Sequence, residues 1–342
     1  MTNPIQFPII STFSIIQCLF WVGKNRRRTA SKLRAMTLIE VIVALSILSV
    51  LLALSTPAIQ SARESARRAQ CQNNLRQIAA ASMQFQSVHR KLPTNGWGFA
   101  WLGMAARGTG SEQPGGWIFQ LLPFVEAQSY YDLASSSDPA TLSTGLEKLA
   151  ATPLSLMTCP SRPGPVLHPQ TTAFNYRNAN TPALIATTDY AINEGDWPSD
   201  TRSGPDSLDE GDGGLFQWAD TGKVTGVSWQ RGSVATDRIQ DGSSHTYLIG
   251  EKRVATSGFS DRGNDQSMYS GVDLDITRWT MEAPSPDGVF DNPLDRRFGS
   301  AHASGCYMAM CDGSVQFKSY SIHPNIHRAL GHRKDGDIGA NP

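Results

Sequence analysis

The chain has 342 residues, with 30 basic and 30 acidic side chains and a formal net charge of zero. The charge is unevenly distributed, because residues 1–35 hold six of the basic residues and none of the acidic ones. Without this segment the chain carries 24 basic and 30 acidic residues, a formal net charge of −6. Such a balance argues against a nucleic-acid-binding surface, which requires clustered Lys and Arg.

Residues 1–35 end in a basic run at 24–34. The apolar stretch ahead of this run is short and interrupted by serine, so we do not expect it to span a membrane. It is either part of an unusually long leader or the product of an overextended gene start. In both cases residues 1–35 are set aside from reasoning about the fold.

Residues 36–59 are strongly apolar and contain no Lys or Arg. A helix of this length crosses a bilayer, which needs ~20 residues. The basic run before it predicts a cytoplasmic leader, and an extracytoplasmic or periplasmic location for everything after residue 59. The first acidic residue of the chain, Glu40, lies inside this stretch. Inserting a carboxylate into a membrane costs roughly 2.5–3.5 kcal/mol, so its presence there indicates a functional role. Pro57 is expected to kink the helix or to mark a boundary.

A basic leader, a small residue, Thr-Leu-Ile-Glu and an apolar run follow one another here. This order resembles the N-terminus of type IV prepilins and type II secretion pseudopilins. The resemblance implies that a prepilin peptidase cuts between Ala35 and Met36, and that Met36 is then methylated. It also implies that Glu40 pairs with the N-terminal amine of a neighbouring pilin-like subunit during filament assembly. Ala35 and Met36 stand where Gly and Phe are usual, and an ordinary signal anchor is the alternative.

The pattern after residue 59 predicts an amphipathic continuation of the helix over residues 60–90. Glu64 precedes Arg68 by four residues, which gives the helix weak support. The segment 89–93 is expected to end the helix. Apolar or small residues mark the expected buried stripe, in a first set and then in a second set spaced by four and three: Ile59, Ala62, Ala66, Ala69, then Cys71, Leu75, Ile78, Ser82, Phe85.

Residues 91–342 are sufficient for one sizeable domain with its own core. Short β-like runs occur at 117–122, 246–250 and 307–310, and the Asp-Gly pairs at 241–242 and 312–313 are turn signals. The expected fold class is α+β, with a pilin-like long N-terminal helix packed on a mainly antiparallel sheet with long loops.

His302, nine intervening residues and then Asp312-Gly313 match the His-x9-Asp-Gly signature of the DUF1559 family. The chain resembles this pseudopilin-like family in further blocks, which occur in order at residues 71–78, 117–126, 158–161, 239–251, 298–302 and 328–330. The resemblance leaves the biochemical role undefined. We interpret Asp312-Gly313 as a hairpin turn, and His302 as a residue that begins the first strand and bonds to a loop. A catalytic or metal-binding role is the alternative.

The cysteines are expected to form one bridge. Four remain once Cys18 leaves with the leader, and four allow three pairings. The resemblance places Cys71 and Cys159 in family blocks and implies a disulfide between them. Cys306 and Cys311 would point to opposite faces of one strand, so they bridge only across a bulge, and two buried free thiols are equally expected. Paired Cys-x2-Cys units for zinc are absent from the sequence.

The sequence evidence for a catalytic or metal-binding site is weak. His323, His327 and His332 lack a metalloprotease setting, and surface or capping roles are favoured. Residues 241–245 have triad chemistry, but as sequence neighbours their side chains diverge. An acidic loop is either solvated or a calcium site, as in some major pseudopilins, although it lacks EF-hand spacing. Its residues are Asp200, Asp206, Asp209, Glu210 and Asp212.

The preferred interpretation is a non-catalytic, single-pass protein of the inner membrane that assembles with other pilin-like subunits and requires no cofactor. The alternative is a polysaccharide- or ligand-binding module displayed on a pilin-like stem, with exposed tryptophans stacking on sugars. A weaker alternative is a hydrolase built around His302 and Asp312. The tryptophans in question are Trp97, Trp101, Trp197, Trp218 and Trp229.

Overall fold

The computed structural model describes residues 37–162, 167–170, 175–199, 202–256, 264–289 and 295–336. The chain forms two compact units, residues 1–59 and 60–342. In the first unit, helix α1 (Leu38–His89) begins and continues through Pro57. Every side chain from 38 to 59 is exposed, and this part of α1 is long and apolar enough to cross a membrane. Ala35, Met36 and Cys18 lie outside the described residues.

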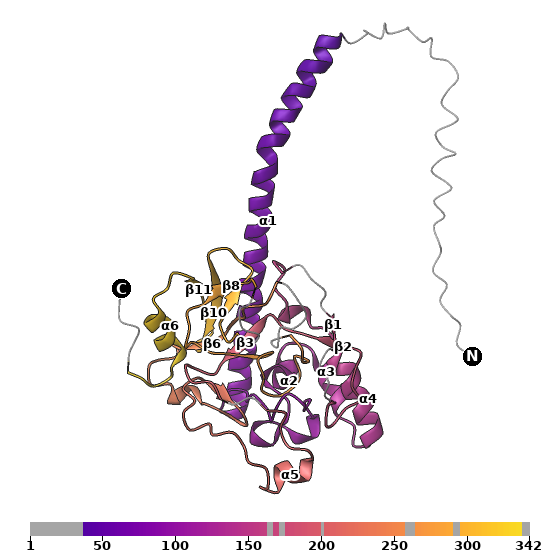
Figure 1. The fold of residues 1–342 in the computed structure, drawn as a ribbon, viewed down its shortest axis with the longest axis vertical. Helices are drawn as coiled ribbons and strands as arrows, with labels where there is room; N and C mark the ends of the chain where they lie inside the picture. Colours follow the sequence, from indigo (N-terminus) through magenta and orange to yellow (C-terminus); the bar gives the residue numbers. More distant parts are fainter. Residues whose placement is uncertain are drawn as a thin grey trace, which may run out of the picture. The chain divides into compact units, whose positions relative to one another are not determined.

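A five-stranded sheet organises the second unit (Figure 1). Its order is β11 (Val315–Ser319), β10 (Gly305–Met310), β6 (Tyr247–Glu251), β3 (Tyr190–Asn193) and β7 (Thr277–Arg278). All neighbours are antiparallel except β3 and β7, which are parallel. The α+β class and the mainly antiparallel sheet predicted from the sequence are therefore confirmed.

Short elements and loops surround this sheet. Three two-stranded pairs are β1 (Leu167–Pro169) with β2 (Leu184–Ala186), β4 (Ser228–Trp229) with β5 (Gly232–Ser233), and β8 (Ser285–Pro286) with β9 (Gly299–Ser300). The further α-helices are α2 (Trp117–Leu121), α3 (Gln128–Tyr131), α4 (Pro139–Ala150), α5 (Leu208–Asp212) and α6 (Pro324–Gly331). The 3-10 turns are η1 (Ala105–Arg107), η2 (Gly110–Glu112), η3 (Leu122–Phe124), η4 (Asp132–Ala134), η5 (Ser155–Met157) and η6 (Thr236–Arg238).

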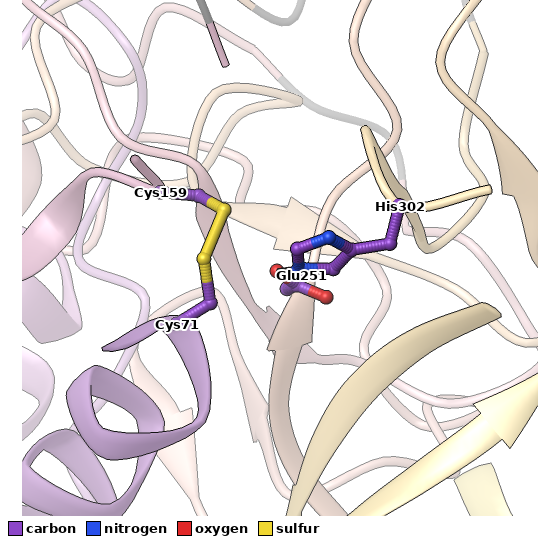
Figure 2. A group of neighbouring side chains, drawn as sticks. All are labelled: Cys71, Cys159, Glu251 and His302. Carbon is purple, nitrogen blue, oxygen red and sulfur yellow. Dashed lines mark ion pairs between the residues drawn. A yellow bond between two sulfur atoms is a disulfide. The ribbon is translucent and has the colours of Figure 1, made fainter. Parts of the chain in front are cut away.

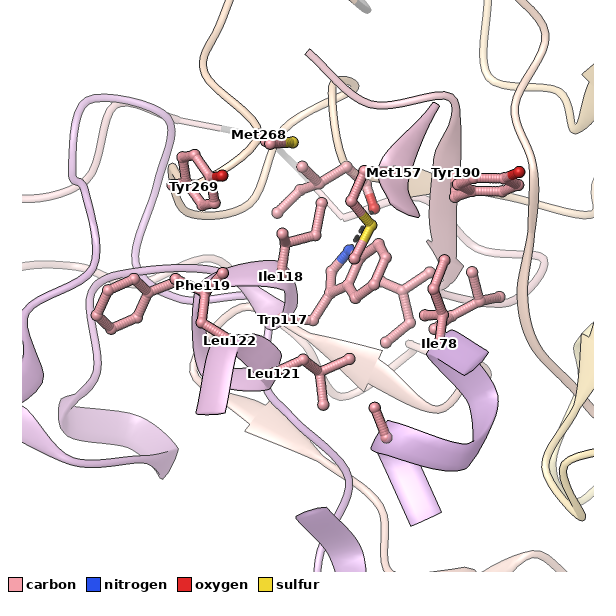
Figure 3. Packing of buried hydrophobic residues seen from close by; sticks show 14 of the residues in the cluster. Ile78, Trp117, Ile118, Phe119, Leu121, Leu122, Met157, Tyr190, Met268 and Tyr269 are labelled. Atoms are coloured by element: carbon pink, nitrogen blue, oxygen red, sulfur yellow. Dashed lines mark hydrogen bonds between the residues drawn. The ribbon is translucent and has the colours of Figure 1, made fainter. Parts of the chain in front are cut away.

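Apolar clusters cover both faces of the sheet at β10. Side chains alternate along β10, so that Met308 belongs to a cluster with Leu330 of α6, whereas Ala309 faces the larger core. The larger core contains the second half of α1 and α2 (Figure 3). The stripe expected from spacings of four and three is buried there: Cys71, Leu75, Ile78, Ser82 and Phe85. The earlier positions of the stripe, Ile59, Ala62, Ala66 and Ala69, are exposed in the single chain.

The prediction of a β-like run at 117–122 is wrong. Residues Trp117–Leu121 form α2, in which every side chain is buried, and the indole N–H of Trp117 donates to the carbonyl of Ile276 at 2.9 Å. A short apolar run has no periodicity that separates a strand from a fully buried helix. The other two β-like runs fall in β6 and β10.

Candidate functional site

Glu40 caps the start of α1. Its carboxylate accepts the backbone N–H of Thr37 at 2.8 Å, and its own N–H donates to the Thr37 hydroxyl at 3.3 Å. This reciprocal pair is a capping box, which satisfies two N–H groups that a helix start otherwise leaves unpaired. The side chain is exposed in the single chain, so it is accessible to a partner.

His302 lies in the loop before β10, where its side chain is fully buried between two carboxylates. Its Nδ1 is 3.0 Å from Oε1 of Glu64 on α1, and its Nε2 is 3.5 Å from Oε1 of Glu251 in β6. Glu251 is itself fully buried, and its other oxygen accepts the N–H of Tyr307 at 2.8 Å. Figure 2 shows the imidazole beside the Glu251 carboxylate and close to a disulfide. The side chain of His302 thus links helix α1 to strand β6. The sequence-based prediction that this side chain bonds to a loop is wrong.

The two carboxylates favour a protonated His302. Burial lowers the pKa of the imidazole, but the contacts with Glu251 and Glu64 outweigh burial and raise this pKa above its usual value. For Glu64, partial burial is opposed by Arg67 and His302, which together hold the pKa of the carboxyl below its usual value. The two carboxylates therefore favour the imidazolium form, which Nδ1 links to Glu64 by a hydrogen bond and Nε2 links to Glu251 by a longer ion pair.

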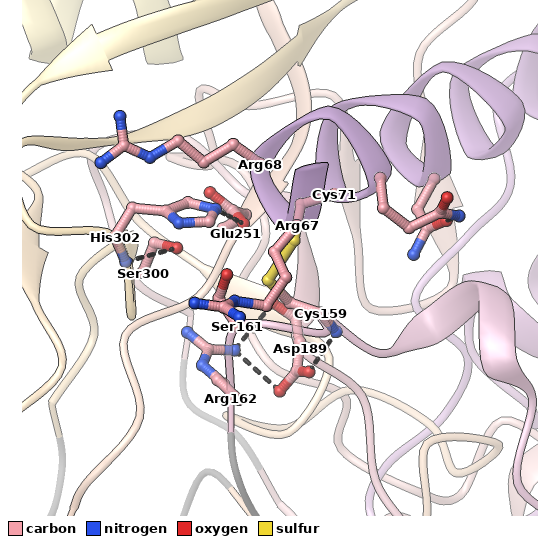
Figure 4. Close-up of a disulfide and its surroundings, with 12 residues drawn as sticks. Arg67, Arg68, Cys71, Cys159, Ser161, Arg162, Asp189, Glu251, Ser300 and His302 are labelled. Carbon is pink, nitrogen blue, oxygen red and sulfur yellow. Dashed lines mark hydrogen bonds and ion pairs between the residues drawn. A yellow bond between two sulfur atoms is a disulfide. The ribbon is translucent and has the colours of Figure 1, made fainter. Parts of the chain in front are cut away.

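A disulfide and a buried arginine continue this cluster (Figure 4). Cys71 of α1 is bonded to Cys159, and their Cα atoms are 5.3 Å apart. The backbone N–H of Cys159 donates to Asp189, which also pairs with Arg162 at 2.7 Å. Arg162 reaches Asp287 at 2.8 Å on its other side and donates to the carbonyl of Lys252. Although burial opposes it, Asp287 and Asp189 raise the pKa of Arg162 well above its usual value.

The structure separates the two halves of the His-x9-Asp-Gly signature. His302 precedes β10, whereas Asp312 and Gly313 form the turn after it, and a strand of that length spans ~20 Å. Gly313 has φ +87, and Asp312 accepts the N–H of Ser314 at 2.8 Å, so the pair makes the expected hairpin turn. A hydrolase built on His302 and Asp312 together is therefore not supported by the geometry.

Of the remaining predictions for histidines and cysteines, some are confirmed and one is wrong. His323 caps α6 and His332 follows its last residue, as expected for capping roles. The surface role expected of His327 is wrong, because it is fully buried beside Tyr247, and burial lowers its pKa to about 3. In residues 241–245, Asp241 accepts backbone N–H groups of Asp335 and Gly336 and completes no triad. The thiols Cys306 and Cys311 are free and buried, on opposite faces of the sheet.

Three groups of side chains within the described residues have metal-ligand spacing. Cys71, Cys159, Glu251 and His302 form one, but its sulfur atoms are joined in the disulfide and offer no thiolate. The second is Asp241, His332 and Asp335, in which Asp241 already accepts two backbone N–H groups. The third is Asp265, Asp273 and Asp275, whose oxygens lie within 4.8 Å of one another.

The acidic loop expected as a calcium site is arranged differently. Asp206 pairs with Arg177 at 2.6 Å, and Asp212 pairs with Arg107. The carboxylates of this loop within the described residues do not come together as one set of ligands. Asp200 lies outside the described residues.

The tryptophans form no exposed row. Trp97 and Trp101 are buried, Trp218 and Trp229 are half-buried, and Trp197 is 50% exposed. Trp197 and Trp218 line one groove of about 470 Å³ together with Lys223, whose ammonium lies 4.9 Å from the centre of the Trp197 ring.

Sequence reasoning named Cys71, Cys159 and His302 but missed their charged partners. Glu251 ends a family block and could have been found there, whereas Glu64 was seen only as a helix partner of Arg68. Arg162, Asp189 and Asp287 carry no sequence signal, because only the fold brings them together.

Two family profiles match the chain. The one described as Protein of unknown function (DUF1559) matches residues 60–325. The chain belongs to this family. The prokaryotic N-terminal methylation motif matches residues 31–56, so this DUF1559 protein is type IV pilin-like, is processed as a prepilin and is anchored in a membrane. No curated protein and no solved structure matches the chain significantly.

Proposed function

We propose that this DUF1559 protein is a non-catalytic structural subunit of a short filament in a type II secretion or type IV pilus-like machine. The observation that carries the proposal is the methylation motif at residues 31–56, which continues into a helix with exposed apolar side chains. Such a surface requires lipid or a neighbouring helix to cover it. The basic run ahead of the helix supports a cytoplasmic leader and a domain outside the inner membrane, by the positive-inside rule.

Glu40 sets the register of neighbouring subunits in this proposal. A prepilin peptidase cuts between Ala35 and Met36, and the methylated amine of Met36 becomes a cation at the start of the helix. Within the part of the chain that the structure describes, Glu40 accepts hydrogen bonds from Thr37 alone. A carboxylate buried among packed helices needs a cationic partner, and the amine of a neighbouring subunit supplies it.

The first test is mass spectrometry of the N-terminus of the protein purified from its native membranes. We expect a chain that begins at methylated Met36. An uncut chain that retains residues 24–34 would show a signal anchor and overturn the proposal.

The second test compares Glu40→Ala with Ser49→Ala, which removes a polar group from the same exposed helix without changing charge. We expect both variants to be processed. Cross-linking between neighbouring helices should be lost only in Glu40→Ala, and equal cross-linking in the two variants would contradict the role of Glu40.

A displayed ligand-binding module is the alternative, and the groove lined by Trp197 and Trp218 is the observation that favours it. Trp197→Ala should then abolish retention of the full chain on immobilised polysaccharide. The buried positions of Trp97 and Trp101 make this alternative the weaker one.

A further inference from the structure

Three aspartates converge directly before β7, outside the His302 cluster. The carboxylate oxygens of Asp265, Asp273 and Asp275 lie within 4.8 Å of one another. Asp275 is 1% exposed, and the other two are half-buried. Carboxylates removed from water repel one another strongly, because the low dielectric constant of the interior weakens their screening. Such a group is stabilised when protons or a positive charge neutralise it.

Asp275 points to a missing ligand. Its Oδ1 accepts the N–H of Gln266 at 3.1 Å, but its Oδ2 is buried without any hydrogen-bond partner. Lys252 lies alongside and donates to the backbone carbonyl of Asp275 at 2.7 Å, and Arg278 donates to the carbonyl of Thr277 at 3.0 Å. Buried polar oxygens are nearly always satisfied, so this oxygen, beside two further carboxylates, is a ligand position that a cation would fill.

We propose that Asp265, Asp273 and Asp275 bind one calcium ion. Calcium takes oxygen ligands at 2.3–2.6 Å, so two ligands of one ion lie at most ~5 Å apart, as these carboxylates do. The group contains neither His nor Cys, the ligands that zinc and copper favour. Magnesium requires near-ideal octahedral geometry and retains several waters, whereas calcium tolerates an irregular, partly buried set of carboxylates.

The ion would fasten a segment on which the core depends. Between Asp265 and Asp275, the side chains of Met268 and Tyr269 enter the larger core beside α2 (Figure 3). The carbonyl of Ser270 accepts the N–H of Gly116 at 3.0 Å, directly before α2. Calcium would therefore stabilise the whole domain, because it binds only the folded arrangement of the three aspartates.

The test uses the full chain in detergent, stripped with EGTA and titrated with CaCl2 by calorimetry and by thermal unfolding. We expect one ion per chain, a dissociation constant on the order of 0.1–1 mM and a higher unfolding temperature in calcium. Asp275→Asn and Asp273→Asn should each weaken binding at least about tenfold, because each removes a charged ligand. Asp209→Asn, at an exposed aspartate of α5, is the matched control and should bind as the wild type does.

The unfolding temperatures of the variants in EGTA show whether a variant that does not bind calcium is still folded. The Asn variants relieve repulsion, so in EGTA they should unfold at or above the wild-type temperature. No binding by the wild type up to about 10 mM CaCl2, roughly ten times the weakest extracellular sites, would overturn the proposal. Calcium binding by both Asn variants with the wild-type affinity would also overturn it. An equal rise in unfolding temperature with MgCl2 would overturn the assignment to calcium.

Discussion

Two buried clusters of charge lie in the same domain, and they differ in how that charge is balanced. Around the disulfide, cations alternate with carboxylates, with His302 between two glutamates and Arg162 between two aspartates. Before β7, three aspartates meet, and the buried Oδ2 of Asp275 has no hydrogen-bond partner. A buried charge is tolerated when it is paired and hydrogen-bonded, and is strongly destabilising when it is not. Each charged group named in the first cluster therefore has an opposite charge beside it within the chain, whereas the second cluster, on our proposal, is neutralised by an ion.

The cluster around the disulfide, in which cations and carboxylates alternate, is called the balanced cluster below. The largest expected effect is that of Arg162→Met, which removes the cation that pairs with two of its carboxylates. The change leaves Asp189 and Asp287, whose side chains are 17% and 9% exposed, without their cation, and we expect a loss of about 3 kcal/mol in the free energy of unfolding. Denaturant unfolding with the disulfide intact measures this loss. Arg177→Met is the control, because its pair with Asp206 is exposed and should contribute less than about 1 kcal/mol. Similar losses in the two variants would show that the Arg162 network adds no more than a surface pair.

Local patterns in the sequence predicted the parts of the fold whose cause is local. The spacing from Cys71 to Phe85 predicted the buried face of α1, and Asp312-Gly313 predicted a turn, because helical period and positive φ belong to single segments. The prediction of a β-like run at 117–122 is wrong, since the helical form of this segment is imposed by burial on all sides. Tertiary packing decides the structure of such short segments.

The balanced cluster was predictable in its members but not in its partners. Cys159 and His302 stand in recognisable blocks, but Glu64 lies 238 residues from His302 and faces it only because α1 packs against the sheet. The signature also suggested that His302 and Asp312 act together, although the length of β10 keeps them apart. Sequence proximity here reflects one continuous strand and not one site.

Glu194 gives an intermediate case, a single buried carboxylate. Burial raises its pKa to about 8, against a hydrogen bond from Ser199 that favours the charged form. Between pH 4.5 and 8 the folded state keeps a proton that the unfolded state has lost, so stability falls as pH rises through this window. Glu194→Gln should abolish that fall and be more stable than the wild type by about 3 kcal/mol at pH 9. Parallel pH profiles of denaturant unfolding for the two proteins would contradict this.

His302→Gln tests the charge in the balanced cluster and keeps a hydrogen-bond donor. The stabilisation from His302 is fully present below pH 6.5 and is lost as pH rises through the raised pKa of the folded state. The contribution of Glu64 is present above pH 4.5 and is lost as pH falls through its lowered pKa. We therefore expect a loss of about 2 kcal/mol near pH 6, which shrinks at higher pH. A loss that does not change with pH would mean that packing, and not the imidazolium, holds the helix to the strand.

The smallest expected effects distinguish the two clusters most clearly. Replacing one carboxylate by its amide should lower the free energy of unfolding in the first cluster and raise it in the second. Glu64→Gln removes a carboxylate that His302 and Arg67 both contact, and should cost about 1 kcal/mol. Asp275→Asn removes one of three carboxylates that repel one another, and should add about 1 kcal/mol in EGTA. In saturating calcium this gain should reverse, because the wild type then gains a ligand that the variant binds weakly. Unfolding of both variants with and without calcium measures the signs. A loss for Asp275→Asn in EGTA would mean that the chain itself balances the aspartates, and the difference between the two clusters would disappear.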